Sequence, residues 1–215
     1  MDEIIQGIAI YALPVIFAIT MHEAAHGYIA KHFGDFTAFN EGRISLNPIR
    51  HIDLIGTILV PLTLFVLSKM TIGAGFLFGW AKPVPVNLNN LRNPKVDDIL
   101  ITMAGPWMNL LLAVVLLGMA KIGLLTDAKA LTEFSYMGAI TSLALFFFNL
   151  LPIPPLDGSR VMRVLVGMSH ETFAQLARFG FLMIIVVINF TPAPQFLGFL
   201  IRASTSVIGS WFGIN

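Results

Sequence analysis

The chain contains no cysteine and few charged residues. Cysteine is absent from all 215 residues, and Asp, Glu, Lys and Arg together make up only 12% of them. That is about half of the charged share that is usual in soluble domains. The missing cysteines exclude a disulfide framework and a zinc site built from thiolates. Any transition metal must therefore be bound by histidine and carboxylate side chains.

Hydrophobic residues, in contrast, make up 56% of the chain and recur in runs along its whole length. Most of these runs approach the roughly 17–25 residues that a transmembrane helix needs. The six runs cover residues 4–31, 53–68, 98–120, 134–151, 173–190 and 195–212. No polar segment is long enough to form a separate soluble module. We therefore expect one membrane-embedded domain over residues 1–215, an all-α polytopic membrane protein with about 5–6 transmembrane helices.

Two basic stretches constrain the topology. Residues 32–51 carry Arg43 and Arg50 directly after Lys31, and residues 69–95 carry four Lys and Arg side chains. Basic loops tend to lie on the cytoplasmic side of a membrane. A single span over residues 53–68 would place them on opposite sides. We therefore expect residues 53–81 to form a hairpin or re-entrant excursion, with both basic stretches in the cytoplasm. The net charge of +1 gives no indication of nucleic-acid binding.

A proline-rich stretch follows this excursion and completes a region that we assign to residues 53–87. Pro83 and Pro85 alternate with Val84 and Val86, so the stretch cannot be helical and favours an extended backbone. One interpretation is an interfacial loop anchored by Trp80. The other is an exposed backbone edge at Val84 and Val86, which would bind an extended peptide as an added strand.

The first hydrophobic run carries a candidate metal site. His22 and His26 are four positions apart, and this spacing places both side chains on one face of a helix, where they can bind one metal ion. Glu23 lies between them and can reach a water molecule on that metal. A catalytic zinc site usually has three protein ligands and keeps one position for water. The sequence therefore predicts a zinc site with two ligands on this helix and a third ligand from elsewhere in the chain.

The third ligand has several candidates. His32 lies ten positions beyond His22, about 15 Å along a continuous helix, which is too far to share the metal. Asp157 is better placed, because it follows an apolar segment broken by prolines, and ionisable residues in such segments are often functional. An N-cap role is the structural alternative for Asp157. Glutamates elsewhere in the chain stay available as ligands, at Glu41, Glu133 and Glu171.

Three motifs in a fixed order resemble the site-2 protease family of intramembrane zinc metalloproteases, in a compact form without PDZ or CBS modules. They read His22-Glu23-x-x-His26, Gly105-Pro106-x-x-Asn109 and Asn149-x-x-Pro152-x-Pro154-x-Leu156-Asp157-Gly158. The resemblance implies that His22, His26 and Asp157 ligate one zinc ion per chain and that Glu23 is the general base. It also implies that Asn109 and Asn149 engage the substrate near the active site.

The resemblance implies an endopeptidase that cleaves locally unwound transmembrane segments of membrane proteins. A membrane-embedded protease that cuts soluble or lipidated peptides and, with less support, a metal transporter or sensor stay open as alternatives. We assign residues 4–31 to the metal-binding helix, 98–120 and 134–151 to core helices, and 173–212 to a C-terminal helix pair. We expect an integral protein of a prokaryotic cell membrane, with its active site towards the cytoplasm and no nucleic-acid partner.

Overall fold

A computed structural model of the chain describes residues 2–59, 63 and 81–214. These residues form helices and connecting segments, and no strand occurs among them. The long helices are α1 (Asp2–His32), α4 (Pro94–Leu125), α5 (Lys129–Asn149) and α9 (Ala193–Trp211). Shorter helices are α2 (Thr37–Asn40), α6 (Asp157–Leu165), α7 (His170–Ala177) and α8 (Gly180–Phe190), with single turns at Pro48–His51, Leu54–Leu59 and Leu88–Asn90. The all-helical class expected from the sequence is confirmed.

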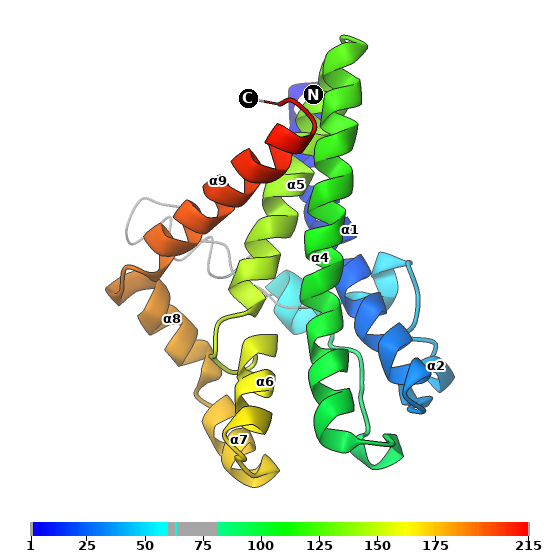
Figure 1. Cartoon of the computed structure of the whole chain (residues 1–215), viewed down its shortest axis with the longest axis vertical. Coiled ribbons are helices and arrows are strands. Elements are labelled where there is room, and N and C mark those ends of the chain that lie inside the picture. The colour runs from blue at the N-terminus through cyan, green and yellow to red at the C-terminus, as the bar shows by residue number, and fades with distance from the viewer. Residues whose placement is uncertain (1, 60–62, 64–80, 215) are drawn as a thin grey trace.

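Helices α1, α4 and α5 form the core of the molecule, as Figure 1 shows. Small residues line their contacts, and Ala18, Ala113 and Ala139 are fully buried among leucines of α4 and α5. Small side chains allow helix backbones to approach closely, which is the usual packing of helices in a membrane. Helix α9 packs against α5, whereas α8 and α9 meet at an open angle.

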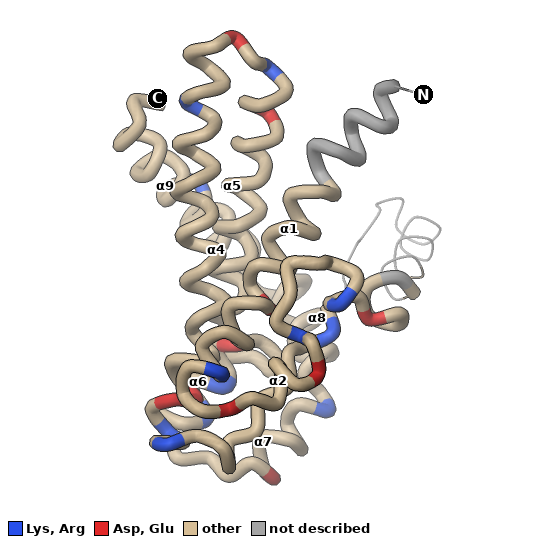
Figure 2. The backbone as a smooth tube through the Cα atoms, turned by 90° about the vertical axis from the view of Figure 1, so that its right-hand side faces the viewer, with Lys and Arg blue, Asp and Glu red and all other residues tan. Residues whose placement is uncertain are grey.

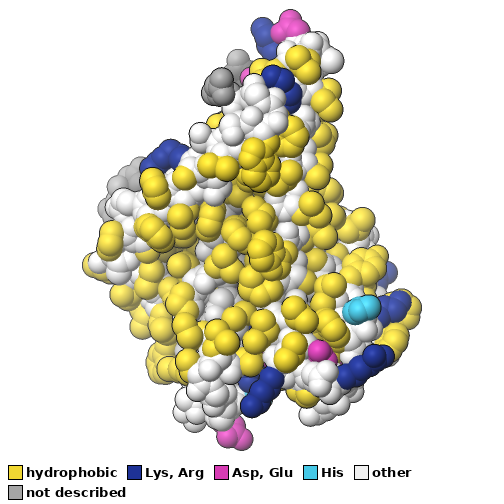
Figure 3. All heavy atoms as spheres, viewed as in Figure 1, with side chains coloured by type: hydrophobic (Ala, Val, Ile, Leu, Met, Phe, Trp, Pro, Cys, Tyr) yellow, Lys and Arg dark blue, Asp and Glu magenta, His cyan; other side chains and the backbone are white. Residues whose placement is uncertain are grey.

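The distribution of charge is that of a protein embedded in a bilayer. Figure 2 shows few charged residues along the middle of α4 and α5 and many around α2, α6 and α7 at one end. Hydrophobic side chains cover most of the face in Figure 3, between charged groups at its two ends. The chain therefore presents an apolar belt to its surroundings.

Two helices of the described residues, α4 and α5, are long and apolar enough to cross a membrane. Helices α7 and α8 make a third candidate if they are counted as one span, although they meet at a bend of 58°. These two or three candidates among the described residues do not confirm the expected 5–6 spans. The hydrophobic run at 173–190 is broken between Ala177 and Gly180. Most of the hairpin expected over residues 53–81 lies outside the described residues.

The segment between α5 and α6 brings the beginning of α6 to α1. Three prolines, Pro152, Pro154 and Pro155, follow α5 and prevent it from continuing. Helix α6 then begins at Asp157, and an ion pair between Arg163 and Asp98 holds α6 against α4. Both partners of this pair are buried. The packing of α6 against α4 therefore determines where the first residue of α6 lies.

Candidate metal centre

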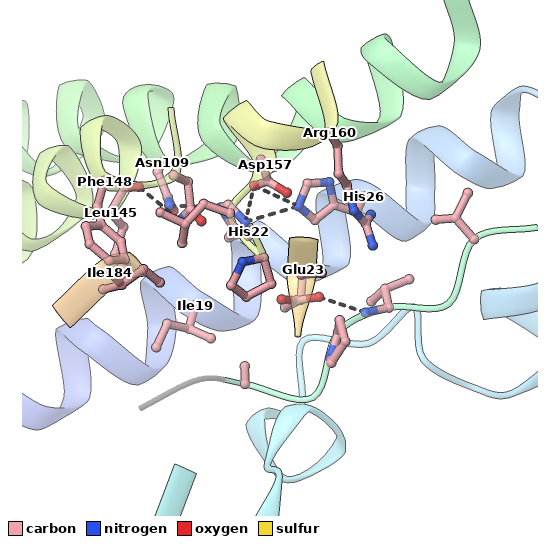
Figure 4. Close-up of a pocket in the computed structure, with 18 of the residues that line it drawn as sticks. Ile19, His22, Glu23, His26, Asn109, Leu145, Phe148, Asp157, Arg160 and Ile184 are labelled. Carbon is pink, nitrogen blue, oxygen red and sulfur yellow. Dashed lines mark hydrogen bonds and ion pairs between the residues drawn. The ribbon is translucent and has the colours of Figure 1, made fainter. Parts of the chain in front are cut away.

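Helix α1 places His22, Glu23 and His26 within one turn, as expected. Both histidines are buried, with 7% and 8% of their surfaces exposed, and their Nε2 atoms lie 3.0 Å apart. The two rings point away from the helix axis towards α4 and α6 (Figure 4). A buried pair of imidazoles with converging ring nitrogens is an arrangement in which both nitrogens can share one cation.

Asp157 completes this group from the beginning of α6. Its Oδ2 atom lies 3.1 Å from Nε2 of His22 and 3.5 Å from Nε2 of His26. The N-terminal turn of α6 comes so close to the end of α5 that a Cβ atom on Gly158 would overlap the carbonyl of Leu150. Glycine at position 158 therefore allows the close approach that brings the Asp157 carboxylate to the histidines.

The three ligand atoms fit a zinc ion. Zinc–ligand bonds of about 2.0–2.1 Å in a tetrahedral arrangement separate the ligand atoms by about 3.3 Å. The three separations here are 3.0, 3.1 and 3.5 Å. Oδ2 of Asp157 is buried and receives no hydrogen bond from the described residues, which is costly for a carboxylate oxygen unless a cation binds it. Glu41, Glu133 and Glu171 are not part of this group.

Helix α4 orients both histidine rings through their other nitrogen atoms. Nδ1 of His26 lies 2.7 Å from the carbonyl oxygen of Ile101. Since a carbonyl only accepts hydrogen bonds, Nδ1 carries the proton and Nε2 keeps the lone pair that a metal needs. Sequence reasoning missed this contact, because a backbone carbonyl has no signature in the residue type.

The amide of Asn109 contacts the other histidine. Asn109 is fully buried, and its Nδ2 atom lies 3.0 Å from Nδ1 of His22. In this orientation its Oδ1 atom has no partner. Exchanging the amide oxygen and nitrogen, which have nearly the same shape, lets Oδ1 accept the Nδ1 proton of His22. Both histidines then present a free Nε2 lone pair to the same point.

Gly105 provides the space in which the two histidine rings lie. A Cβ atom at this position would lie 2.6 Å from Cε1 and Nε2 of His22 and would overlap Nε2 of His26. No side chain other than hydrogen fits there without moving a ring. This contact explains why a glycine occurs at this position of α4, in the middle of a long helix where glycine is otherwise unfavourable.

A cavity of about 480 Å³ opens beside the metal group. All eight residues that the sequence suggested for the site line this cavity: His22, Glu23, His26, Val84, Val86, Asn109, Asn149 and Asp157. Oε2 of Glu23 accepts a hydrogen bond of 2.9 Å from the backbone nitrogen of Val84, drawn in Figure 4. Nδ2 of Asn149 donates to the carbonyl of Leu145 in its own helix.

Helix α8 and two arginines contribute lining residues that sequence reasoning did not select. Phe181 and Ile184 of α8 close one side, and Arg160 and Arg178 add positive charge to the wall. Arg160 follows Asp157 by three positions, so the i, i+3 spacing on α6 was an available signal. Phe181 and Ile184 had no such signal, because they reach the cavity only through the way α8 packs in the tertiary structure.

The chain is similar to a known protein family and to individual bacterial proteins. A family model described as Peptidase family M50 matches residues 116–190. A protein of Bacillus subtilis (strain 168) named "Putative zinc metalloprotease YwhC" is 39% identical over 183 residues, which are 81% of this chain and 78% of the relative. The chain belongs to peptidase family M50. This membership confirms the resemblance to the site-2 proteases that the three motifs indicate.

More distant relatives of this M50 chain are mycobacterial. A protein of Mycolicibacterium smegmatis named "Putative zinc metalloprotease Rip2" is 30% identical over 181 residues, which cover 83% of this chain and 65% of that protein. A Rip2 of Mycobacterium tuberculosis (strain Erdman) is 26% identical over 143 residues, 66% of this chain and 52% of the relative. No solved structure matches the chain. The M50 chain is a zinc metalloprotease of the membrane.

Proposed function

We propose that this M50 chain is an intramembrane endopeptidase that hydrolyses peptide bonds in locally unwound transmembrane segments. The observation that carries the proposal is the place of the metal group, which lies between apolar helices, inside a cavity with mostly apolar walls. A substrate segment that enters this cavity from the lipid exchanges one apolar environment for another. A soluble peptide would find little there to replace its hydration.

In this proposal His22, His26 and Asp157 bind the zinc ion. When bound, zinc acts as a Lewis acid that polarises the scissile carbonyl and lowers the pKa of a bound water molecule. Glu23 takes the proton of the attacking water on a carboxylate oxygen and delivers it to the nitrogen of the leaving amine. Asn109 and Ile101 hold the two imidazole rings in the tautomer that leaves Nε2 free.

The substrate must expose its backbone before it can react. A transmembrane helix uses its amide groups in internal hydrogen bonds, so the cleaved segment has to unwind, and its freed groups then need partners inside the membrane. Asn149 can offer its amide to this backbone, because it lies on the cavity wall and, among the described residues, its side chain binds only the Leu145 carbonyl of its own helix. Contacts of Asn109, Val84 and Val86 with the unwound substrate are also predictions.

We extend the proposal to the topology of the chain. Residues 1–215 would form one membrane-embedded domain with 5–6 spans and a re-entrant region over residues 53–87, estimated from the lengths of the hydrophobic runs. The charged end near α2, α6 and α7 would face the cytoplasm, because it carries most of the basic loops. The active site would then open towards that side of a prokaryotic membrane.

The Glu23→Gln variant tests the enzymatic part of this proposal. Glutamine keeps the size of the side chain but cannot accept the water proton at neutral pH, so we expect cleavage of a membrane-spanning substrate to fall by about 10²–10⁴-fold. Zinc content should not change, since Glu23 is not a ligand. Glu133→Gln, at an exposed position of α5, is the matched control. Undiminished turnover by Glu23→Gln would refute the assignment of the base.

A second experiment separates intramembrane from surface proteolysis. The same cleavage sequence is offered as a membrane-spanning segment and as an excised soluble peptide. We expect turnover of the spanning form only, and preferential cleavage of the soluble form would favour a protease that acts at the membrane surface. Metal transport is tested in parallel, because flux that survives Glu23→Gln would indicate a transit site.

A further inference from the structure

Residues 81–87, which we call the strap, pass beside helix α1 at Glu23. They contain no helix, and Pro83 and Pro85 remove two backbone donors from them. The amide of Val84, between these prolines, donates to Oε2 of Glu23 at 2.9 Å. A hydrogen bond to a carboxylate is shorter and stronger than one between neutral groups. The strap therefore holds Oε2 of Glu23 in place, and Oε1 has no hydrogen-bond partner among the residues that the structure describes.

A buried arginine anchors one end of the strap. Only 6% of Arg43 is exposed, and its guanidinium donates to the carbonyl of Lys82 at 2.6 Å and to that of Pro83 at 3.4 Å. The backbone nitrogen of Lys82 in turn donates to the carbonyl of His51 at 2.9 Å. Within the described residues Arg43 has no carboxylate partner. A buried cation that binds only backbone carbonyls fixes the position of those carbonyls.

A buried carboxylate anchors the other end. Asp35 is fully buried and accepts a hydrogen bond of 2.7 Å from the backbone nitrogen of Asn87. Its other oxygen accepts from the side chain of Asn90 at 2.8 Å and from the backbone and hydroxyl of Thr37. Asp35 follows the end of α1 by three positions, so the helix that carries Glu23 and the strap share one anchor.

We propose that the strap is a positioning element for Glu23, and that Arg43 acts as a positioning residue through the Val84 amide. The inference rests on the proposed role of Glu23 as general base. In the free protein the Val84 N–H is already bound to Glu23, so the substrate contacts predicted for Val84 and Val86 would use other groups of the strap. The strap thus orients the base for proton transfer, whereas a strand-pairing role would instead act on substrate binding.

The pair Val84→Pro and Val84→Ala isolates this hydrogen bond. Both variants replace the branched side chain of Val84, but only proline removes the backbone N–H. With the full-length zinc-loaded protein and a membrane-spanning substrate, we expect kcat of Val84→Pro to be about 10- to 100-fold lower than that of Val84→Ala. KM should agree within about twofold, because binding is not changed, and zinc content should be the same in both.

Variants of Arg43 test whether it acts through the same contact. Arg43→Met removes the donor and should lower kcat in the same way, while Arg43→Lys should restore part of it, because an ammonium can still reach one carbonyl. The double variant Arg43→Met/Val84→Pro should be no more than about threefold slower than the slower single variant, since both changes release the same carboxylate. Multiplied losses would mean that Arg43 acts elsewhere.

Two outcomes would overturn the inference, and both differ from a failure of the proposed function. One is an equal kcat for Val84→Pro and Val84→Ala. The other is a higher KM of Val84→Pro with an unchanged kcat, together with weaker substrate binding by Val84→Pro in an inactive Glu23→Gln background. That result would assign the strap to substrate pairing. In either case Glu23→Gln remains inactive. Retained turnover by Glu23→Gln alone would refute the role of the base itself.

Discussion

Replacing Gly105 with alanine tests how α4 shapes the metal centre. The added methyl group would lie 2.6 Å from Cε1 and Nε2 of His22, whereas ordinary van der Waals contact begins at 3.4 Å. The difference, 3.4 minus 2.6, means that the His22 ring must move by about 0.8 Å. It cannot move alone, because Nε2 of His26 is overlapped by the same methyl group.

This displacement is large on the scale that a metal site tolerates. Ligands must be held within about 0.5 Å of their productive positions, and loss of the contacts that orient ligands commonly lowers metal affinity by 10- to 100-fold. We therefore expect Gly105→Ala to lower zinc affinity by at least about 10-fold. The helix itself should gain from the change, because alanine is favoured over glycine in a helix interior by about 0.5–1 kcal/mol. The two effects have opposite signs, so a loss of zinc cannot be attributed to a weaker helix.

The measurement is zinc content of the purified protein in competition with a graded series of chelator. Gly118→Ala is the matched control, since it lies on the same helix and the three heavy atoms nearest to its methyl group all belong to the Phe212 ring, with Cε1 at 3.2 Å. That ring can yield by a few tenths of an ångström. Zinc retention by Gly105→Ala that is indistinguishable from Gly118→Ala would refute the packing argument. Cleavage activity should fall together with zinc content.

Two further predictions concern single carboxylates. Asp157→Ala should lose zinc in the same competition measurement, because only two ligands remain, and undiminished occupancy would place the third ligand elsewhere. Burial opposes the charge of Asp35, but hydrogen bonds from Thr37, Asn90 and Asn87 outweigh it and lower its pKa below the ordinary 3.8. Its stabilising effect is therefore complete above pH 3.8 and is lost as the pH falls through the lowered pKa. The free energy of unfolding of Asp35→Asn should be about 1–3 kcal/mol lower than that of the natural chain at neutral pH. This difference should narrow in acid. An equal difference in thermal unfolding at about pH 7 and about pH 3 would contradict the prediction.

The positions of the long helices and the histidine pair of the metal centre could be predicted from local spacing, whereas Asp157 was indicated by the proline-broken segment before it and by the resemblance of the ordered motifs. Hydrophobic runs at 98–120 and 134–151 correspond to α4 and α5, with ends that differ by a few residues. His22 and His26 converge because the helical period places positions four apart on one face. These features depend on the spacing of residues along the chain, which the sequence gives directly.

Other features depend on contacts between distant segments. The break between α7 and α8 lies at Arg178, the one charged residue of the hydrophobic run at 173–190. The average hydrophobicity of that run favoured one straight span and did not reveal the break. The partner of the His26 ring is the carbonyl of Ile101, and the partner of Glu23 is the amide of Val84. Backbone groups are the same in every residue, so no pattern of side chains identifies them.

The sequence by itself determined the membrane class, the donor types available to a metal, and the helix that carries two of them. Composition decides the first two points, because the chain has no cysteine and is rich in apolar runs. The four-residue spacing of His22 and His26 decides the third. Only the tertiary structure decided that the carboxylate of Asp157 meets the histidines, that Gly105 leaves room for their rings, and that the strap reaches Glu23. Each of these contacts joins segments far apart in the chain, and their distances follow from packing rather than from spacing along the sequence.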